Sequence, residues 1–226
     1  MKSTSHASVR VAKLRQDFVR FGQMLHAQQF VAATDGNFSA RIDGERLLVT
    51  PTGFSKGMMK PEDMVVVDFS GKKLDGIHDP SSEIAMHLTI YSMRADVGAV
   101  VHAHPYTATA FACAGIALDE PVCSEVVIAL GTVPLAPYAT TGTDELSESL
   151  KPFIPDHQAI LMANHGVVSY AEDLPRAYMK MEVVEHYARI VLVTRQLGAT
   201  RAFDQNQLGK LLQVRSRYAR GVMVAD

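Results

Sequence analysis

Apolar residues recur at intervals of three to five positions between residues 11 and 30, and this spacing predicts an amphipathic helix. After this segment the pattern changes to short apolar runs bounded by turn residues, which is typical of strands. Two of these runs flank Asp43-Gly44, as the strands of a hairpin would. The predicted strands are 37–42, 46–49, 64–69, 99–103, 126–130, 159–162 and 167–170. The predicted helices are 11–30, 84–94, one that begins at Pro105, one from about Asp144, and 174–197.

The order of these elements favours one mixed α/β domain over residues 1–226. Hairpins are interleaved with helices instead of alternating strictly with them. A largely antiparallel sheet covered by helices is therefore favoured over a doubly wound parallel sheet. The chain contains no internal repeat and no Pro-, Gly- or Ser-rich stretch long enough to join two domains.

Composition and charge exclude several classes of protein. With 22 Lys and Arg against 24 Asp and Glu, the chain has no sustained basic stripe, which argues against nucleic-acid binding. Residues 97–118 carry no charged side chain but contain two histidines and a proline, so we interpret them as a buried strand and helix and not as a membrane span. The two cysteines and the lack of an apolar signal stretch predict a cytoplasmic protein.

Histidines form the strongest candidate for chemistry. His102 and His104 lie at the end of a predicted strand, where residues two apart project to the same face and can bind one ion. His165 lies between two short predicted strands, and Glu83 lies at a predicted helix start. Three imidazoles and one carboxylate suit Zn²⁺, with Mn²⁺, Co²⁺ or Fe²⁺ as alternatives. Two other interpretations stay open: core histidines bonded to carbonyls, or a rival pair of Glu83 with His87 on one helix face.

Three short stretches of small donors are candidates for an anion site. They are Thr34-Asp35-Gly36-Asn37, Thr50-Pro51-Thr52-Gly53 and Ser81-Ser82. Hydroxyls, amides and glycine-exposed backbone N–H groups can surround a phosphate, and the serine pair precedes a predicted helix. Each stretch taken alone is an ordinary turn. Together, with Ser82 adjoining Glu83, they would place a phosphorylated substrate next to a metal ion. Lys56, shortly after the second stretch, is a candidate to approach the phosphate, but we favour its interpretation as an exposed loop lysine.

Six segments together carry a family resemblance: TDGNFSAR, LVTPTGFSKG, PSSE, VVHAHP, PYATTGT and ANHGVV. In this order and approximate spacing, from about residue 11 to residue 197, they resemble the class II aldolase/adducin family, and most of all its fuculose-phosphate aldolases. The resemblance implies a three-layer α/β/α fold with a largely antiparallel central sheet. It also implies a zinc-type ion and a homotetramer with active sites between subunits.

The resemblance assigns a role to each matching position. His102, His104 and His165 match the metal histidines of the family, and Glu83 matches a carboxylate that both touches the ion and moves a proton. The positions that match the phosphate-binding residues are Gly36, Asn37, Thr52, Gly53, Ser81 and Ser82.

One segment departs from the family pattern. In the fuculose-phosphate aldolases a tyrosine of the neighbouring subunit acts as a second acid/base, and residues 121–127 contain no tyrosine here. Glu125 or Ser124 is expected to replace it, or Tyr218 near the C-terminus, which resembles a tail tyrosine of some members.

The expected function is reversible aldol cleavage of a ketose 1-phosphate similar to L-fuculose 1-phosphate. The products are dihydroxyacetone phosphate and a small aldehyde, and a divalent ion stabilises the enediolate formed when the carbon–carbon bond breaks. The alternatives are an epimerase, decarboxylase or dehydratase that acts on a sugar phosphate through the same kind of intermediate. The remaining hypothesis belongs to a different class of protein: a non-catalytic, adducin-like assembly module.

Overall fold

The computed structural model describes the backbone of residues 2–219 and the side chains of residues 9–217. Its centre is one eight-stranded sheet with the strand order β4-β3-β2-β1-β5-β8-β7-β6. All neighbouring strands are antiparallel except β6 and β7. The strands are β1 (Asn37–Arg41), β2 (Arg46–Val49), β3 (Val65–Asp68), β4 (Lys73–Asp75), β5 (Ala99–Ala103), β6 (Leu135–Ala136), β7 (Ala159–Met162) and β8 (Gly166–Ala171).

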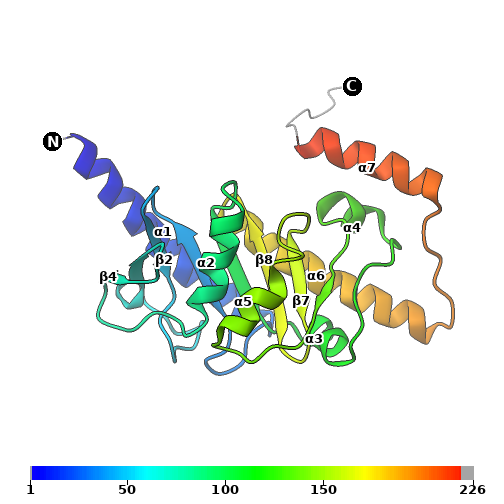
Figure 1. Cartoon of the computed structure of the whole chain (residues 1–226), viewed down its shortest axis with the longest axis horizontal. Helices are drawn as coiled ribbons and strands as arrows, with labels where there is room; N and C mark the ends of the chain where they lie inside the picture. The colour runs from blue at the N-terminus through cyan, green and yellow to red at the C-terminus, as the bar shows by residue number, and fades with distance from the viewer. Residues whose placement is uncertain (1, 220–226) are drawn as a thin grey trace.

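Helices cover both faces of this sheet, which confirms the three-layer arrangement (Figure 1). One apolar core packs α1 and α6 against one face, and a second packs α2 and α5 against the other. Alternate strand residues enter the two cores, as in β3, where Val66 belongs to the first core and Val67 to the second. The helices are α1 (Lys2–Ala27), α2 (Ile84–Met93), α3 (Tyr106–Cys113), α4 (Ser124–Ala129), α5 (Asp144–Leu150), α6 (Leu174–Gln196) and α7 (Gln205–Ala219), with a 3₁₀ turn at Pro61–Asp63.

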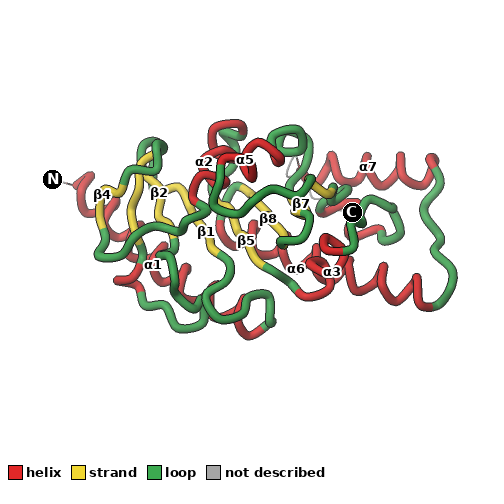
Figure 2. The backbone as a smooth tube through the Cα atoms, turned by 60° about the horizontal axis from the view of Figure 1, so that its bottom comes forward, coloured by secondary structure: helices red, strands yellow, loops and turns green. Residues whose placement is uncertain are grey.

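The register of the central strands determines where the chemistry lies. Asn37 of β1 pairs with His102 of β5, and His102 pairs with Val168 of β8. The beginning of β1, the end of β5 and the turn before β8 therefore lie side by side, where these three central strands of the sheet end (Figure 2). Helix α2 begins beside these strand ends, and Glu83 is its N-cap residue.

The structure corrects one predicted element and adds others. Residues 126–130, predicted as a strand, belong to helix α4 and its C-terminal cap. An apolar run of this length fits a strand or a buried helix equally well, and here Val126 and Leu130 enter the core while the Nη1 of Arg215 in α7 donates to the carbonyl of Val127 (3.1 Å). The first helix ends at Ala27 and not at residue 30, because Gln29 takes a left-handed conformation with φ of 59°.

Helix α7 and strands β4 and β6 have no counterpart among the predicted elements. Strands β4 and β6 are only three and two residues long, too short to show an alternating pattern. Within the described residues, none of the helices combines the length and apolar character needed to cross a bilayer.

Candidate metal and anion site

Three histidines converge at these strand ends, and they are the ones that the sequence predicts. One ring nitrogen from each of His102, His104 and His165 lies within 4.8 Å of the other two. The Nε2 atoms of His102 and His104 are 3.1 Å apart. Two nitrogen ligands of one tetrahedral zinc, each about 2.0–2.1 Å from the ion, would be separated by about 3.3 Å. The spacing of the rings therefore fits a shared divalent cation.

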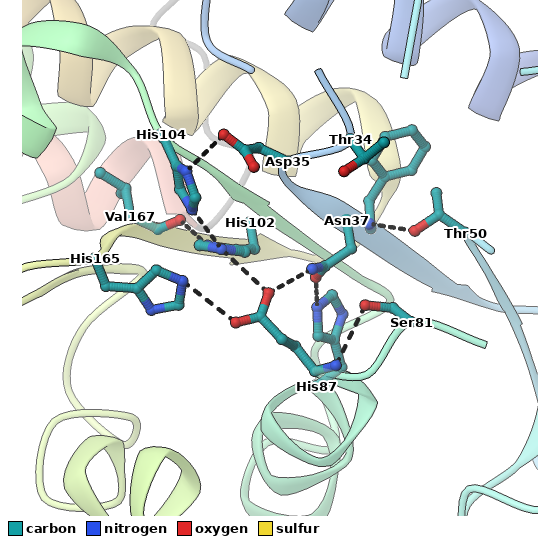
Figure 3. Close-up of polar contacts among 12 residues, drawn as sticks. Thr34, Asp35, Asn37, Thr50, Ser81, His87, His102, His104, His165 and Val167 are labelled. Atoms are coloured by element: carbon teal, nitrogen blue, oxygen red, sulfur yellow. Dashed lines mark hydrogen bonds and ion pairs between the residues drawn. The ribbon is translucent and has the colours of Figure 1, made fainter. Parts of the chain in front are cut away.

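Hydrogen bonds behind the rings determine which nitrogens are free to bind an ion. His102 is fully buried, and its Nδ1 is 2.9 Å from the carbonyl of Val167. Because a carbonyl only accepts, Nδ1 carries the proton and Nε2 presents a lone pair. The Nδ1 of His104 faces the carboxylate of Asp35 at 3.4 Å, which similarly directs its Nε2 inward (Figure 3). Neither histidine is a core residue satisfied on both sides by carbonyls.

His165 is held by a turn that only a glycine can complete. Asn164, just before it, is left-handed with φ of 56°, and Gly166 follows at the start of β8. A Cβ on Gly166 would lie 2.5 Å from the His104 ring and 2.7 Å from the carbonyl oxygen of Ala103, so a side chain at this position would displace the His104 ring and the end of β5. The turn thus brings the rings of His104 and His165 to a centroid separation of 5.2 Å.

Glu83 lies against the histidines from the start of α2. Its Oε1 is 3.3 Å from His165 Nε2, and its Oε2 is 3.4 Å from His102 Nε2. Oε1 is buried and makes no hydrogen bond among the described residues. A buried carboxylate oxygen without a hydrogen-bond partner needs a cation or a proton nearby. The donor set of three imidazoles and one carboxylate therefore fits a zinc-type ion.

Electrostatics keep these groups in the forms that bind cations. Burial lowers the pKa of His102, and burial together with the neighbouring His165 ring lowers that of His104, so both are neutral near pH 7. Burial acts to raise the pKa of Glu83, but the His102 and His165 rings and the amide of Asn37 outweigh it, and the net shift is strongly downward. Glu83 is therefore a carboxylate, able to accept a proton.

A buried chain of hydrogen bonds fixes the orientation of Asn37. Its Nδ2 donates to Glu83 Oε2 (2.7 Å), so its Oδ1 accepts from His87 Nε2 (2.6 Å). The Nδ1 of His87 then accepts from the hydroxyl of Ser39 (2.7 Å), which accepts from Tyr91 (2.9 Å). Both nitrogens of His87 are therefore occupied within the protein. The rival pair of Glu83 with His87 as metal ligands is ruled out by this arrangement.

Two of the three histidines, His104 and His165, border a cavity of about 390 Å³. All six positions that match the family's phosphate-binding residues line it, together with Glu83, His104 and His165. The lining residues are Thr34, Asp35, Gly36, Asn37, Pro51, Thr52, Gly53, Lys56, Ser81, Ser82, Glu83, His104, Thr141 and His165. One wall of the cavity thus carries Glu83 and two of the clustered histidines, and the adjoining loops carry small neutral donors together with Asp35 and Lys56.

The sequence patterns miss some residues of this cavity. They group Asp35 only with its loop, and its contact with His104 depends on a register that no local pattern encodes. Lys56, expected to be an exposed loop lysine, is 1% exposed and lines the cavity. Thr141, in the PYATTGT segment, comes from a loop more than a hundred residues after Thr34.

The candidates for the second acid/base are not part of this cavity in a single chain. Glu125 is exposed on α4, and Ser124 is half-buried at the start of the same helix; neither is among the lining residues. Tyr218 lies in α7, but its side chain is outside the described residues.

Comparisons with known proteins agree with this geometry. The profile described as "Class II Aldolase and Adducin N-terminal domain" matches residues 16–192. The chain is 31% identical to the 5-deoxy-D-ribulose 1-phosphate aldolase of Bacillus thuringiensis over 88% of this chain and 93% of that protein. It is 33% identical to the 3-oxo-tetronate 4-phosphate decarboxylase of Escherichia coli, covering 80% of this chain and 86% of the relative.

A solved structure of an L-fuculose 1-phosphate aldolase superposes with a TM-score of 0.81 at 31% identity, and the match covers 89% of this chain and 95% of that one. The chain therefore belongs to the class II aldolase and adducin family. Its three-histidine cluster is consistent with the divalent metal site typical of this family.

Proposed function

We propose that the chain is a metal-dependent aldolase that reversibly cleaves a ketose 1-phosphate, such as L-fuculose 1-phosphate, to dihydroxyacetone phosphate and a small aldehyde. This proposal rests on the observation that Glu83, two of the clustered histidines and three segments of small donors line the same cavity. A substrate with a phosphate at one end and an adjacent carbonyl needs both kinds of group within a few ångströms.

His102, His104, His165 and Glu83 are proposed to hold the ion, with zinc preferred and manganese, cobalt or iron as alternatives. When bound, such a cation supplies Lewis acidity, which stabilises the negative charge that develops as a bond next to a carbonyl breaks. The protein determines the position of the ligands through Val167 behind His102 and Asp35 behind His104.

Glu83 is proposed to move the proton on the dihydroxyacetone phosphate carbon. The side-chain amide of Asn37 donates a hydrogen bond to Oε2 of Glu83, whereas Oε1 makes no hydrogen bond among the described residues. We therefore propose Oε1 as the oxygen that accepts the proton. Glu83 is ionised at neutral pH, so it is in the form that can accept a proton.

The phosphate is proposed to bind at the loop side of the cavity. Ser81 is buried there, and Gly53 has a positive φ of 73°. The backbone of Gly53 is open, because a Cβ added at this position would meet no atom within 4 Å. The full set of proposed phosphate-binding residues is Gly36, Asn37, Thr52, Gly53, Ser81 and Ser82.

The reaction also needs a second acid/base. Among the described residues of a single chain, none of the expected candidates for this role lines the cavity. Of the expected substitutes for the family tyrosine, Glu125 is exposed and ionisable, and it projects from α4. We propose that Glu125 of a neighbouring copy acts on the aldehyde oxygen in a homotetramer with active sites between subunits.

A second candidate function is decarboxylation of a sugar-acid phosphate. A relative of this activity is 33% identical, about as similar as the aldolases, and residues 121–127 lack the tyrosine that the fuculose-phosphate aldolases use. An adducin-like assembly module is disfavoured, because it has no need for a complete ligand set or for the hydrogen bonds that orient it.

A direct assay separates these functions. Purified, zinc-loaded protein is incubated with L-fuculose 1-phosphate, with 5-deoxy-D-ribulose 1-phosphate and with 3-oxo-tetronate 4-phosphate. Dihydroxyacetone phosphate, measured by its coupled reduction, is expected from one of the first two. Release of CO₂ from the third compound alone would replace the aldolase assignment with a decarboxylase, and no product from any of them would overturn both.

A further inference from the structure

Lys56 is a buried lysine that joins two loops of the anion cavity. Its Nζ donates to the carbonyl of Thr34 at 3.0 Å and also to the carbonyl of Phe54. These carbonyls belong to the two loops that carry Gly36 on one side and Thr52 and Gly53 on the other. The side chain is 1% exposed, yet it is one of the residues that line the cavity.

The charge of Lys56 has no carboxylate partner. Within the described residues Lys56 forms no ion pair, and both of its hydrogen-bond acceptors are neutral carbonyls. Burial lowers its pKa to about 8, and the more distant Asp35 only partly offsets this effect. At neutral pH most of the ammonium is still charged. A buried and unpaired cation is unfavourable, so an anion in the adjoining cavity would gain by neutralising it.

The other lining residues do not provide this positive charge. Gly36, Asn37, Gly53 and the serines are neutral, Asp35 and Glu83 are acidic residues, and no other lysine or arginine is among the described lining residues. Lys56 is therefore the one lysine or arginine among them, and it lies on the loop side of the cavity and not among the residues proposed to hold the ion.

We propose that Lys56 is a phosphate-binding residue that supplies the counter-charge for the substrate's phosphate, in addition to the six positions named above. The inference rests on the proposed function, because it takes the ligand of the cavity to be a phosphorylated ketose. Its consequence is specificity: the positive charge of Lys56 strengthens the preference of the cavity for a phosphorylated ketose over the free sugar, which carries no charge to pair with it.

Phosphate affinity separates a structural role for Lys56 from a counter-charge role. Replacing the lysine removes its two hydrogen bonds to carbonyls, which lowers stability, and also removes a buried charge, which raises it, so the two roles do not differ in the sign of the melting-temperature change. Only the counter-charge role predicts weaker phosphate binding. The Lys56→Met variant tests this contrast, and Lys56→Gln keeps a donor but removes the charge.

The experiment titrates the zinc-loaded protein with inorganic phosphate by calorimetry and measures thermal unfolding in parallel. Lys56→Met and Lys56→Gln are expected to bind phosphate about 10- to 100-fold more weakly than the wild type at a temperature where every variant is folded, the loss typical of a charge-assisted contact. The matched control is Lys72→Met, which removes the same charge from an exposed lysine outside the cavity lining.

The outcomes separate this inference from the proposed function. Phosphate binding by the wild type with unchanged affinity in both Lys56 variants overturns the role of Lys56 and leaves the anion site intact. A lower melting temperature with unchanged affinity assigns Lys56 to loop tethering alone and also overturns the inference. Absence of phosphate binding to the wild type overturns the anion site itself, and Lys56 with it.

Discussion

The cavity has two sides that are built in different ways. The proposed ligand side consists of Glu83, His104 and His165, which line the cavity, together with His102, which is buried with 0% exposure. A strand, the turns that flank strands and a helix start place these residues. The proposed anion side consists of loops, with Thr52, Gly53 and Ser82 exposed. A metal ion tolerates little displacement of its ligands, whereas a phosphate is bound by several weak donors that can adjust.

Asn37 connects the two sides. It belongs to β1, donates to Glu83, and also lines the anion cavity. The fixed orientation of its amide, set by His87, shows how the buried network behind the ligand side extends to a residue that is proposed to meet the phosphate. Because the two sides differ in this way, we expect substitutions on the ligand side to abolish activity and those on the anion side mainly to weaken substrate binding.

The largest effect is expected for His102→Ala. The variant removes a buried ligand whose position is fixed by the carbonyl of Val167, and alanine offers no atom that could bind a cation in its place. After dialysis the metal content, measured by inductively coupled plasma mass spectrometry, is expected to fall to background. Aldol cleavage, measured by the coupled assay, is expected to fall below detection. His186→Ala, an exposed histidine of α6, is the matched control. Full metal content in His102→Ala would show that the cluster is not the metal site.

The next largest effect is expected for Glu83→Gln. Glutamine keeps the size of the side chain and can still contact Asn37, but it cannot accept a proton, so kcat is expected to fall about 10²- to 10⁴-fold. Part of the metal affinity should remain, because the three imidazoles are untouched. Measured metal content and kcat are compared in the same preparation. Wild-type turnover in this variant would refute the proposed role of Glu83 as a base.

A mixing experiment tests the role proposed for Glu125. Glu125→Gln alone is expected to lower kcat about 100-fold with normal metal content. Coexpression with Glu83→Gln, using two different tags, should restore part of the activity in mixed tetramers, because some sites then combine an intact Glu83 with an intact Glu125 from the neighbouring chain. Mixed assemblies that stay inactive would mean that Glu125 is not supplied across subunits.

The sequence patterns locate the ligand side better than its surroundings. Alternation along a strand is enough to place His102 and His104 together, and strand 99–103 matches β5. By contrast, His87 lies one helical turn after Glu83, and its pairing with Asn37 and Ser39 depends on how α2 packs on β1. A local pattern contains no information about that packing.

Two failures have the same physical origin. The run 126–130 is apolar in a way that fits a strand, and only packing against the core and α7 makes it helix α4. Lys56 follows a turn motif in which lysines are usually exposed, and only the closure of two loops over it makes it buried. In both cases tertiary contacts, formed between residues distant in sequence, decide the outcome.

Acid unfolding should reveal the buried network behind the ligand side. Burial lowers the pKa of His87 in the folded protein to about 4, against an unfolded value near 6.5. As the pH falls from 6.5 to 4, the unfolded chain takes up a proton that folded His87 does not, so stability decreases by about 3 kcal/mol over this window.

His87→Gln is expected to remove this contribution, so the free energy of unfolding of the variant should depend less on pH over the same window. Urea titrations of chelator-treated protein at about pH 7 and about pH 4.5 measure it without a contribution from metal release. His186→Gln, at an exposed histidine, should keep the wild-type slope. An unchanged slope in His87→Gln would show that this histidine is not held neutral by burial.

The smallest effect is expected for Ser81→Ala on the anion side. Ser81 lines the cavity, but its Oγ makes only a 3.3 Å contact with the backbone N–H of Glu83, and it is one neutral donor among several. Losing one such hydrogen bond should raise KM about tenfold and change kcat by less than about threefold, with metal content unchanged. Ser92→Ala, an exposed serine on α2 outside the cavity, is the control. A drop in kcat of about 100-fold at constant KM would mean that Ser81 acts through Glu83, and that the two sides of the cavity are not energetically separate.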